Sequence, residues 1–188
     1  MGNIRPICDF WLLGRPKVPY YGAYPNGFLE RARVLLGAHI DEPVLHVCGG
    51  KARDYPGWGF GRGDYTLDLD RKLDPDFFYD AEGPWPTVPM DLAGAIADPP
   101  YTPTDARKYA PGEQRFPKPR AILGTALHHV RPGGRVGMLH YICPRPPAQV
   151  DDCEIRFVAA ASVLVGFDNR VRIFSVFEKR EPKKEARR

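Results

Sequence analysis

Long apolar runs, paired cysteines and nucleotide-binding glycine motifs are all missing from this chain of 188 residues. No apolar run approaches the roughly 18 residues needed to cross a bilayer, so we expect no membrane-spanning helix. The N-terminal residues lack the apolar core and small-residue cleavage site of a signal peptide. These absences predict a cytoplasmic protein whose partners do not include a membrane.

The cysteines are few and isolated, which argues against a zinc site or a disulfide framework. Cys8, Cys48, Cys143 and Cys153 contain no C-x-x-C pair and match no zinc spacing. We expect free thiols, mostly buried, and no bound metal. The sequence also offers no Ser/His/Asp or Cys/His set in an order that suggests nucleophilic catalysis.

The bulk composition is that of one ordinary globular domain. Hydrophobic residues make up 43% of the chain and charged residues 27%, and the net charge is +4. We expect a single domain over residues 1–180 and a basic, disordered tail over 181–188. A mild positive charge permits a polyanionic partner such as nucleic acid but does not require one.

Short apolar runs alternate with helical or irregular segments along most of the chain. We expect an ordered loop over 1–27 and helices over 28–36 and 119–130. Five short strands are expected at 43–48, 64–70, within 74–80, at 91–98 and at 135–142. Two longer runs, 154–165 and 170–177, are separated by a turn and predict an antiparallel hairpin. This order favours an α/β fold with a mostly parallel sheet and an antiparallel edge.

The sequence Asp98-Pro99-Pro100-Tyr101 is the sharpest chemical signal, because it directly follows an expected strand. Ligands of open α/β sheets bind beyond the carboxyl ends of the strands. The prolines stiffen the turn and remove two donors, so that a carboxylate and backbone carbonyls form a cluster of acceptors. Such a cluster, with Tyr101 to stack on a base, suits an exocyclic amino group that becomes positively charged as it attacks a methyl sulfonium. The alternative is a turn that merely ends a strand.

Two further strand ends carry candidate ligand-binding residues. Gly49 and Gly50 follow the first expected strand and would let a ligand approach the backbone, although a plain turn explains them equally well. Asp68, with Asp70 close behind, ends the second strand, where an acid can accept both hydroxyls of a ribose. Asp80 follows the short third strand and could accept from an adenine amino group. An exposed loop acid is the alternative for each.

Together these motifs resemble, in order, those of class I S-adenosylmethionine-dependent methyltransferases of the amino-group branch, the N6-adenine type with a DPPY motif. The resemblance covers about residues 18 to 180 and begins with the aromatic segment 20–25. It implies that Asp98, Pro99, Pro100 and Tyr101 hold the target amine. It also implies that the cofactor, S-adenosylmethionine, contacts Tyr21, Tyr24, His46, Cys48, Gly49, Gly50, Asp68, Asp80 and Ala81.

The same resemblance implies a Rossmann-like sheet of seven strands with helices on both faces and a C-terminal antiparallel hairpin. The expected reaction is methylation of a nucleobase, most directly N6 of adenine, in DNA rather than RNA. The chain has no room for a separate target-recognition domain, so either its specificity is low, or a partner or homodimer supplies it, or the substrate is single-stranded or RNA. Alternatives are methylation of guanine N2 in RNA or of a protein glutamine amide, and a nucleic-acid-binding module without catalysis.

Overall fold

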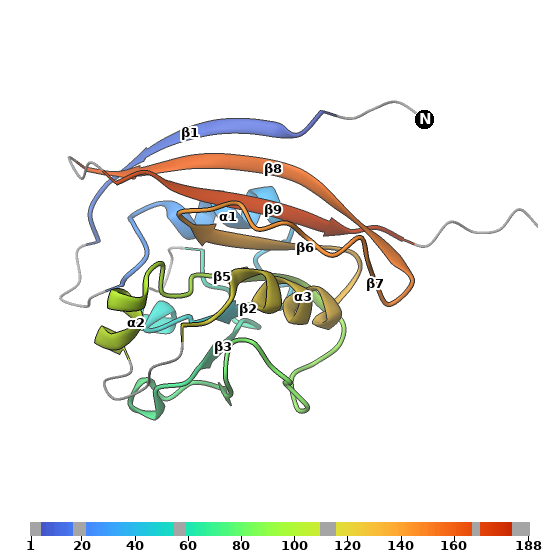
Figure 1. Cartoon of the computed structure of the whole chain (residues 1–188), viewed down its shortest axis with the longest axis horizontal. Helices are drawn as coiled ribbons and strands as arrows, with labels where there is room; N and C mark the ends of the chain where they lie inside the picture. The colour runs from blue at the N-terminus through green and yellow to red at the C-terminus, as the bar shows by residue number, and fades with distance from the viewer. Residues whose placement is uncertain (1–4, 17–21, 55–58, 110–115, 167–169, 182–188) are drawn as a thin grey trace, which may run out of the picture.

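A single mixed sheet forms the centre of the molecule. The computed structural model of the chain describes residues 5–16, 22–54, 59–109, 116–166 and 170–181. The strands lie in the order β1-β8-β9-β6-β5-β2-β3-β4, and β7 pairs with β8 off this path (Figure 1). Their bounds are β1 Ile7–Leu13, β2 Val44–Val47, β3 Tyr65–Asp68, β4 Phe77–Phe78, β5 Leu92–Ala97, β6 Val130–His140, β7 Gln149–Val150, β8 Cys153–Val165 and β9 Arg172–Lys179. The helices are α1 Phe28–Leu36, α2 Pro103–Tyr109 and α3 Pro119–His129, with 3-10 turns η1 Ala52–Asp54 and η2 Arg71–Leu73.

The sheet is parallel at its centre and antiparallel toward one side. β2, β3, β4, β5 and β6 run parallel to their neighbours in this group, whereas β9 runs antiparallel to both β6 and β8. The chain goes outward from β2 to β3 and β4, then returns to β5 on the other side of β2. Such a reversal leaves a crevice at the carboxyl ends of the strands. The topology therefore places a ligand site beyond β2, β3 and β5.

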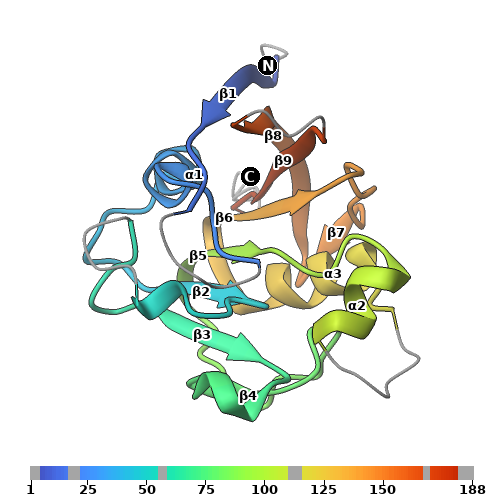
Figure 2. The ribbon, with the colours of Figure 1, turned by 90° about the vertical axis from the view of Figure 1, so that its left-hand side faces the viewer.

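Helices cover the two faces of the sheet, and the sheet separates the hydrophobic core into two clusters. The apolar side of α1, including Phe28 and Ala32, packs in one cluster with Ile96 of β5 and Phe174 of β9. The apolar side of α3 packs in a second cluster with alternate residues of β2, β5 and β6. Figure 2 shows α1 on one side of the sheet and α3 on the other. A helix on each face fits strands β2 and β5, which are buried along their whole lengths.

The expected α/β class and the closing β8–β9 pair agree with the structure, but the described residues form a sheet of nine strands rather than seven. One addition is β7, and the other is β1, which occupies residues 7–13 of the segment expected to be a loop. β1 runs parallel to β8, and Trp11 and Leu13 are buried against the α1 side of the core. Their alternation was hidden in the sequence because the outward residues Phe10 and Leu12 are also apolar, and both are exposed.

Other departures are local. Residues 131–134 lie between the helix expected over 119–130 and the strand expected over 135–142, and they belong to β6, which begins at residue 130. Helix α2 lies in a segment for which no helix was expected. Cys8 and Cys143 are exposed and only Cys153 is fully buried, so the expectation of mostly buried thiols is wrong. No helix among the described residues is long and apolar enough to cross a membrane.

Candidate functional site

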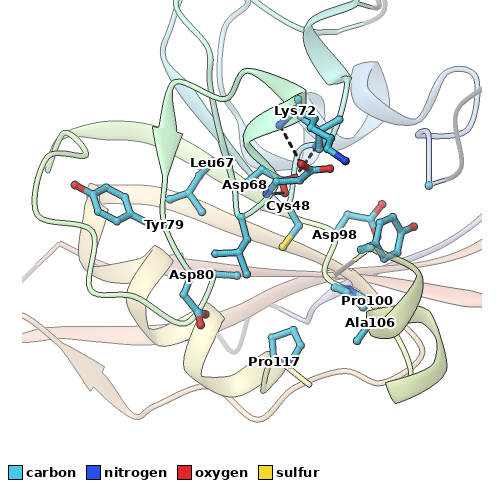
Figure 3. A pocket seen from close by; sticks show the side chains of 17 residues that line it. Cys48, Leu67, Asp68, Lys72, Tyr79, Asp80, Asp98, Pro100, Ala106 and Pro117 are labelled. Carbon is cyan, nitrogen blue, oxygen red and sulfur yellow. Dashed lines mark hydrogen bonds between the residues drawn. The ribbon is translucent and has the colours of Figure 1, made fainter. Parts of the chain in front are cut away.

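A cavity of about 340 Å³ lies at the carboxyl ends of β2, β3 and β5. Eight of the residues singled out from the sequence line it, namely Cys48, Gly50, Asp68, Asp70, Asp80, Ala81, Asp98 and Pro100. In Figure 3, Asp68 and Asp98 lie to either side of Cys48. Three separate strand ends thus contribute to one cavity, as the sheet topology requires.

Asp68, the last residue of β3, is held in place by two backbone amides. Its carboxylate accepts hydrogen bonds from the amide of Gly50, at 3.2 Å, and from the amide of Asp70, at 3.1 Å. Burial raises the pKa of Asp68, and the backbone donors oppose that rise. The carboxylate is therefore fixed in place beside a cavity wall and can accept further hydrogen bonds from a ligand.

The turn after β2 is shaped by local sterics. Cys48 and Gly50 adopt positive φ angles, 54° and 53°, and the Cys48 amide bonds to the carbonyl of Leu67 at 2.8 Å. A Cβ on Gly49 would lie 2.8 Å from His46, so glycine at 49 is required by the turn itself. Gly49 does not line the cavity, and only its neighbours Cys48 and Gly50 do. Burial raises the pKa of the Cys48 thiol, and the nearby Asp68 carboxylate adds to this, so the thiol stays protonated.

Asp80 and Ala81 reach the cavity from the loop after β4. The indole nitrogen of Trp85 donates to the Asp80 carbonyl at 2.8 Å, and Trp85 is buried in the α3 side of the core. The Asp80 carboxylate accepts from the amide of Glu82 at 2.9 Å. A buried aromatic ring thus anchors this loop, although little regular structure surrounds it.

Asp98 follows β5 and opens into the cavity from the side opposite Asp68. The hydroxyl of Tyr101 donates a hydrogen bond to one of its carboxylate oxygens. Burial raises the pKa of Asp98 to about 6, against the opposing effects of Tyr101 and the positive charge of Arg172. Pro100 lines the cavity, whereas Pro99 is buried and lies outside the lining.

Tyr101 does not line the cavity; it lies behind Asp98 in a group of rings. Its ring centroid is 4.8 Å from that of Tyr141 and 5.4 Å from that of His140. The guanidinium carbon of Arg172, at the start of β9, is 5.5 Å from the Tyr101 centroid. The Asp98 carboxylate therefore sits between the cavity and an aromatic and basic neighbourhood.

Two predicted cofactor contacts lie elsewhere. His46 is fully buried on the α1 side of the sheet, where its Nε2 is 3.2 Å from Asp64. Tyr24 is also buried, stacked on Phe28 with centroids 5.2 Å apart. Both side chains belong to the core because their backbone positions direct them to the α1 face, away from the strand ends. Tyr21 lies outside the described residues.

Several cavity residues carried no recognisable signal in the sequence. Lys72, Tyr79 and Tyr109 line the cavity from η2, from the loop after β4 and from α2. Arg172 was indistinguishable from any residue at the beginning of a strand. Lys72 could have been suspected, since it follows the strand-end acids directly. Among the described residues, no group of three His, Cys, Asp or Glu side chains could hold a metal ion.

Comparisons with known proteins support the fold. No family model and no curated protein sequence matches this chain. Among solved structures, TrmN from Thermus thermophilus is similar with a TM-score of 0.55 and 19% identity, over 83% of this chain and 49% of that one. This chain therefore spans about half the length of the Thermus protein.

Two further structures match over most of both chains. One is a chain of the complex between the Haloferax volcanii Trm112 methyltransferase activator and its methyltransferase, with TM-score 0.53, 11% identity and coverage of 82% and 90%. The other is PH1948 of Pyrococcus horikoshii, provisionally named an RNA methyltransferase, with TM-score 0.50, 13% identity and coverage of 84% and 82%. At these identities the likeness establishes the Rossmann-like fold shared by these methyltransferases.

Proposed function

We propose that this chain transfers a methyl group from S-adenosylmethionine to an exocyclic amino group of a nucleobase, with N6 of adenine as the first candidate. The observation that carries the proposal is the place of Asp98. Its carboxylate is tied to Tyr101 and opens into the same cavity as Asp68 and Asp80. One cavity thus joins an acceptor cluster for an amine to two carboxylates suited to a nucleoside.

The residues of the cavity fit the cofactor. Its volume, about 340 Å³, lies within the range of small-molecule sites. Asp68 would accept the ribose hydroxyls, Asp80 the adenine amino group, and the Cys48–Gly50 turn would lie along the methionine part. When bound, S-adenosylmethionine supplies an electrophilic methyl group on a sulfonium.

Asp98 would hold the target amine at the other side of this cavity. Because Tyr101 occupies one carboxylate oxygen, the second oxygen is left to accept from an amino proton. The carboxylate would also stabilise the positive charge that develops on the nitrogen as its bond to the methyl carbon forms and the bond between that carbon and the sulfonium sulfur breaks. The leaving group would be S-adenosylhomocysteine, and the methylated nitrogen would then lose one proton to solvent. The Pro99 carbonyl, expected from the sequence as the second acceptor, belongs to a residue outside the cavity lining, so the proposal assigns the amine to Asp98. A base in a duplex would first have to be flipped out.

The choice of polymer is the open part of the proposal. The Pyrococcus neighbour is named for RNA, so RNA stands beside DNA as a substrate class. The Haloferax neighbour comes from a complex with an activator, which supports a separate partner for this chain, and a homodimer is the other candidate source of specificity. Methylation of guanine N2 or of a glutamine amide is the alternative within the same fold. In the methyltransferases that this chain resembles, those acting on guanine N2 or on a glutamine amide usually carry Asn at the first motif position, so Asp98 favours adenine.

The direct test follows a tritiated methyl group from S-adenosylmethionine into DNA, RNA and protein pools. We expect incorporation into nucleic acid, and we expect Asp98→Ala to reduce turnover at least 100-fold, since an oxyanion-type partner typically supplies that much. Asp91→Ala, at the other end of β5 and exposed, is the matched control and should keep full activity. Cofactor binding by calorimetry should survive in both variants.

Two results would count against the proposal. Normal turnover by Asp98→Ala would remove this carboxylate from the reaction. A lack of cofactor binding at millimolar concentration would favour a nucleic-acid-binding module without catalysis.

A further inference from the structure

Opposite charges occupy the two sides of Asp98 at the carboxyl edge of the sheet. On the cavity side, Asp68, Asp70 and Asp80 line the wall together with Lys72. On the other side, β1, β6 and β8 end and β9 begins, as their register shows. The described residues there, 13–16, 140–148, 163–166 and 170–173, contain no Asp or Glu. Asp168, in the turn between β8 and β9, lies outside the described residues.

Four arginines occur in these ranges, and three of them lie around the start of β9, whereas the fourth, Arg145, follows β6. Arg172 begins β9 and pairs with Val163 of β8, and Arg170 is exposed two residues before it. Arg15, exposed just after β1, lies against the same turn, because a Cβ on Gly166 would be 3.4 Å from its side chain. The sheet register therefore gathers Arg15, Arg170 and Arg172 at the end where Asp98 opens.

Arg172 is the arginine nearest to the proposed acceptor site, and its hydrogen bonding is incomplete. Among the residues that the structure describes, its buried Nε has no hydrogen-bond partner. The guanidinium lies by the ring of Tyr101, and the structure shows no ion pair for Arg172 within the same residues. A buried donor left without a partner destabilises the state in which it occurs. A bound anion would satisfy it, and the planar guanidinium matches a phosphate in a two-point contact.

We propose that Arg172, with Arg15 and Arg170, binds the phosphate backbone of a nucleic acid beside the target nucleotide. The inference rests on the proposed function and specifies the side from which the nucleic acid approaches. The nucleic-acid strand would cross the ends of β9, β8 and β1, while the cofactor would fill the cavity beyond β2 and β3. Tyr141, half-buried and 4.8 Å from Tyr101, offers a ring for stacking next to these phosphate contacts. Phosphate contacts of this kind set position rather than sequence.

The test measures the affinity of labelled single-stranded DNA and RNA at several potassium chloride concentrations. We expect Arg172→Gln to weaken binding about 5- to 20-fold for every sequence and to reduce the slope of log affinity against log salt by about one. Arg172→Lys should keep most of that slope because the charge remains. Arg180→Gln is the matched control: Arg180 follows β9 at its far end, paired with Glu154, and its loss should leave the slope unchanged.

Calorimetry with S-adenosylhomocysteine separates this inference from the proposed function. One outcome is that cofactor binding and methyl transfer are normal while Arg172→Gln and Arg180→Gln have the same slope of log affinity against log salt. This outcome would overturn the phosphate site but not the proposed methyltransferase activity. A wild-type protein that binds neither polymer but methylates protein would overturn the phosphate site and the nucleic-acid substrate together. If Arg172→Gln unfolds early, the exposed Arg170→Gln decides, since an unchanged slope there also contradicts the proposal.

Discussion

Asp98 lies in a buried environment that disfavours its ionised form, although its proposed role requires the ionised carboxylate. Burial raises its pKa to about 6, although Tyr101 and Arg172 favour the ionised form. The carboxylate is the form that accepts from an amine, so methyl transfer should rise with pH through about 6 and level off above 7. Initial rates between pH 5 and 8 measure this. Asp98→Asn cannot titrate, and whatever activity it retains should be flat over that range; a wild-type profile without a midpoint between 5 and 7 would contradict the assignment.

The same raised pKa predicts that Asp98 lowers stability at neutral pH. Its folded-state pKa lies above the unfolded value of 3.8, so folding is favoured by the protonated form and this contribution is lost as pH rises through about 6. Asp98→Asn should therefore increase the free energy of unfolding by about 1–3 kcal/mol at pH 7.5. The gain should disappear below about pH 4. Urea unfolding at both pH values checks this, and a loss of stability at pH 7.5 would show that the ionised carboxylate supports the fold.

Residues at strand ends were predictable from the sequence, and residues within strands were not. Asp68, Asp80 and Asp98 were found because the carboxyl end of a parallel strand is where ligands bind, and all three line one cavity. His46 lies only two residues before the strand-end turn, yet it points into the α1 side of the core. A sequence shows that a residue is near the end of a strand, but not which face a helix will cover. The sequence likewise does not show that the ring of Tyr24, in the loop before α1, stacks on Phe28 in the core.

At the level of elements, an internal ion-pair cluster ties α1 to the sheet. The Asp64 carboxylate, just before β3, accepts from the Arg33 guanidinium of α1, from the amide of Val44 at 3.0 Å and from the amide of Gly61 at 2.7 Å, and lies 3.2 Å from His46. Burial opposes ionisation, but these donors lower the pKa of Asp64. This cluster accounts for a buried histidine in β2.

Removing one member of that cluster should destabilise the fold without touching the cavity. Asp64→Ala leaves Arg33 buried and unpaired, which typically costs about 3–5 kcal/mol. Chemical denaturation should show this loss, while Asp41→Ala, with a side chain 77% exposed, should change the free energy of unfolding by less than about 0.5 kcal/mol. S-adenosylhomocysteine affinity of the folded fraction should stay within about threefold. A stable Asp64→Ala protein would mean that Arg33 finds water or another acceptor.

The elements that the sequence did not reveal are those whose pattern is ambiguous. The strands β2, β3, β5, β8 and β9 were expected within a few residues of their observed bounds, because buried apolar runs stand out between turns. β1 did not stand out, since it lies at the edge of the sheet with apolar residues on both faces, including the exposed Phe10 and Leu12. α2 was missed because it is only seven residues long and follows the proline-rich turn.

For the whole molecule, a net charge of +4 hides a separation of charge that only the fold creates. Apart from Asp98, the acids of the cavity come from residues 68–80, whereas Arg15, Arg170 and Arg172 come from both ends of the chain. The sheet places Arg15 beside the turn before Arg172 through the parallel pairing of β1 with β8. No spacing rule along the sequence connects residues that far apart.

This separation predicts that the two proposed ligands respond differently to salt. Binding of S-adenosylhomocysteine depends on hydrogen bonds inside a cavity, so its affinity should change less than about twofold between 50 and 200 mM potassium chloride. Nucleic acid that engages three arginines should release about three counterions and lose about 20- to 40-fold in affinity over the same range. Parallel calorimetry and fluorescence titrations on one preparation measure both. Nucleic-acid affinity as insensitive to salt as cofactor affinity would mean that stacking near Tyr101 and Tyr141, rather than phosphate contact, provides the binding free energy.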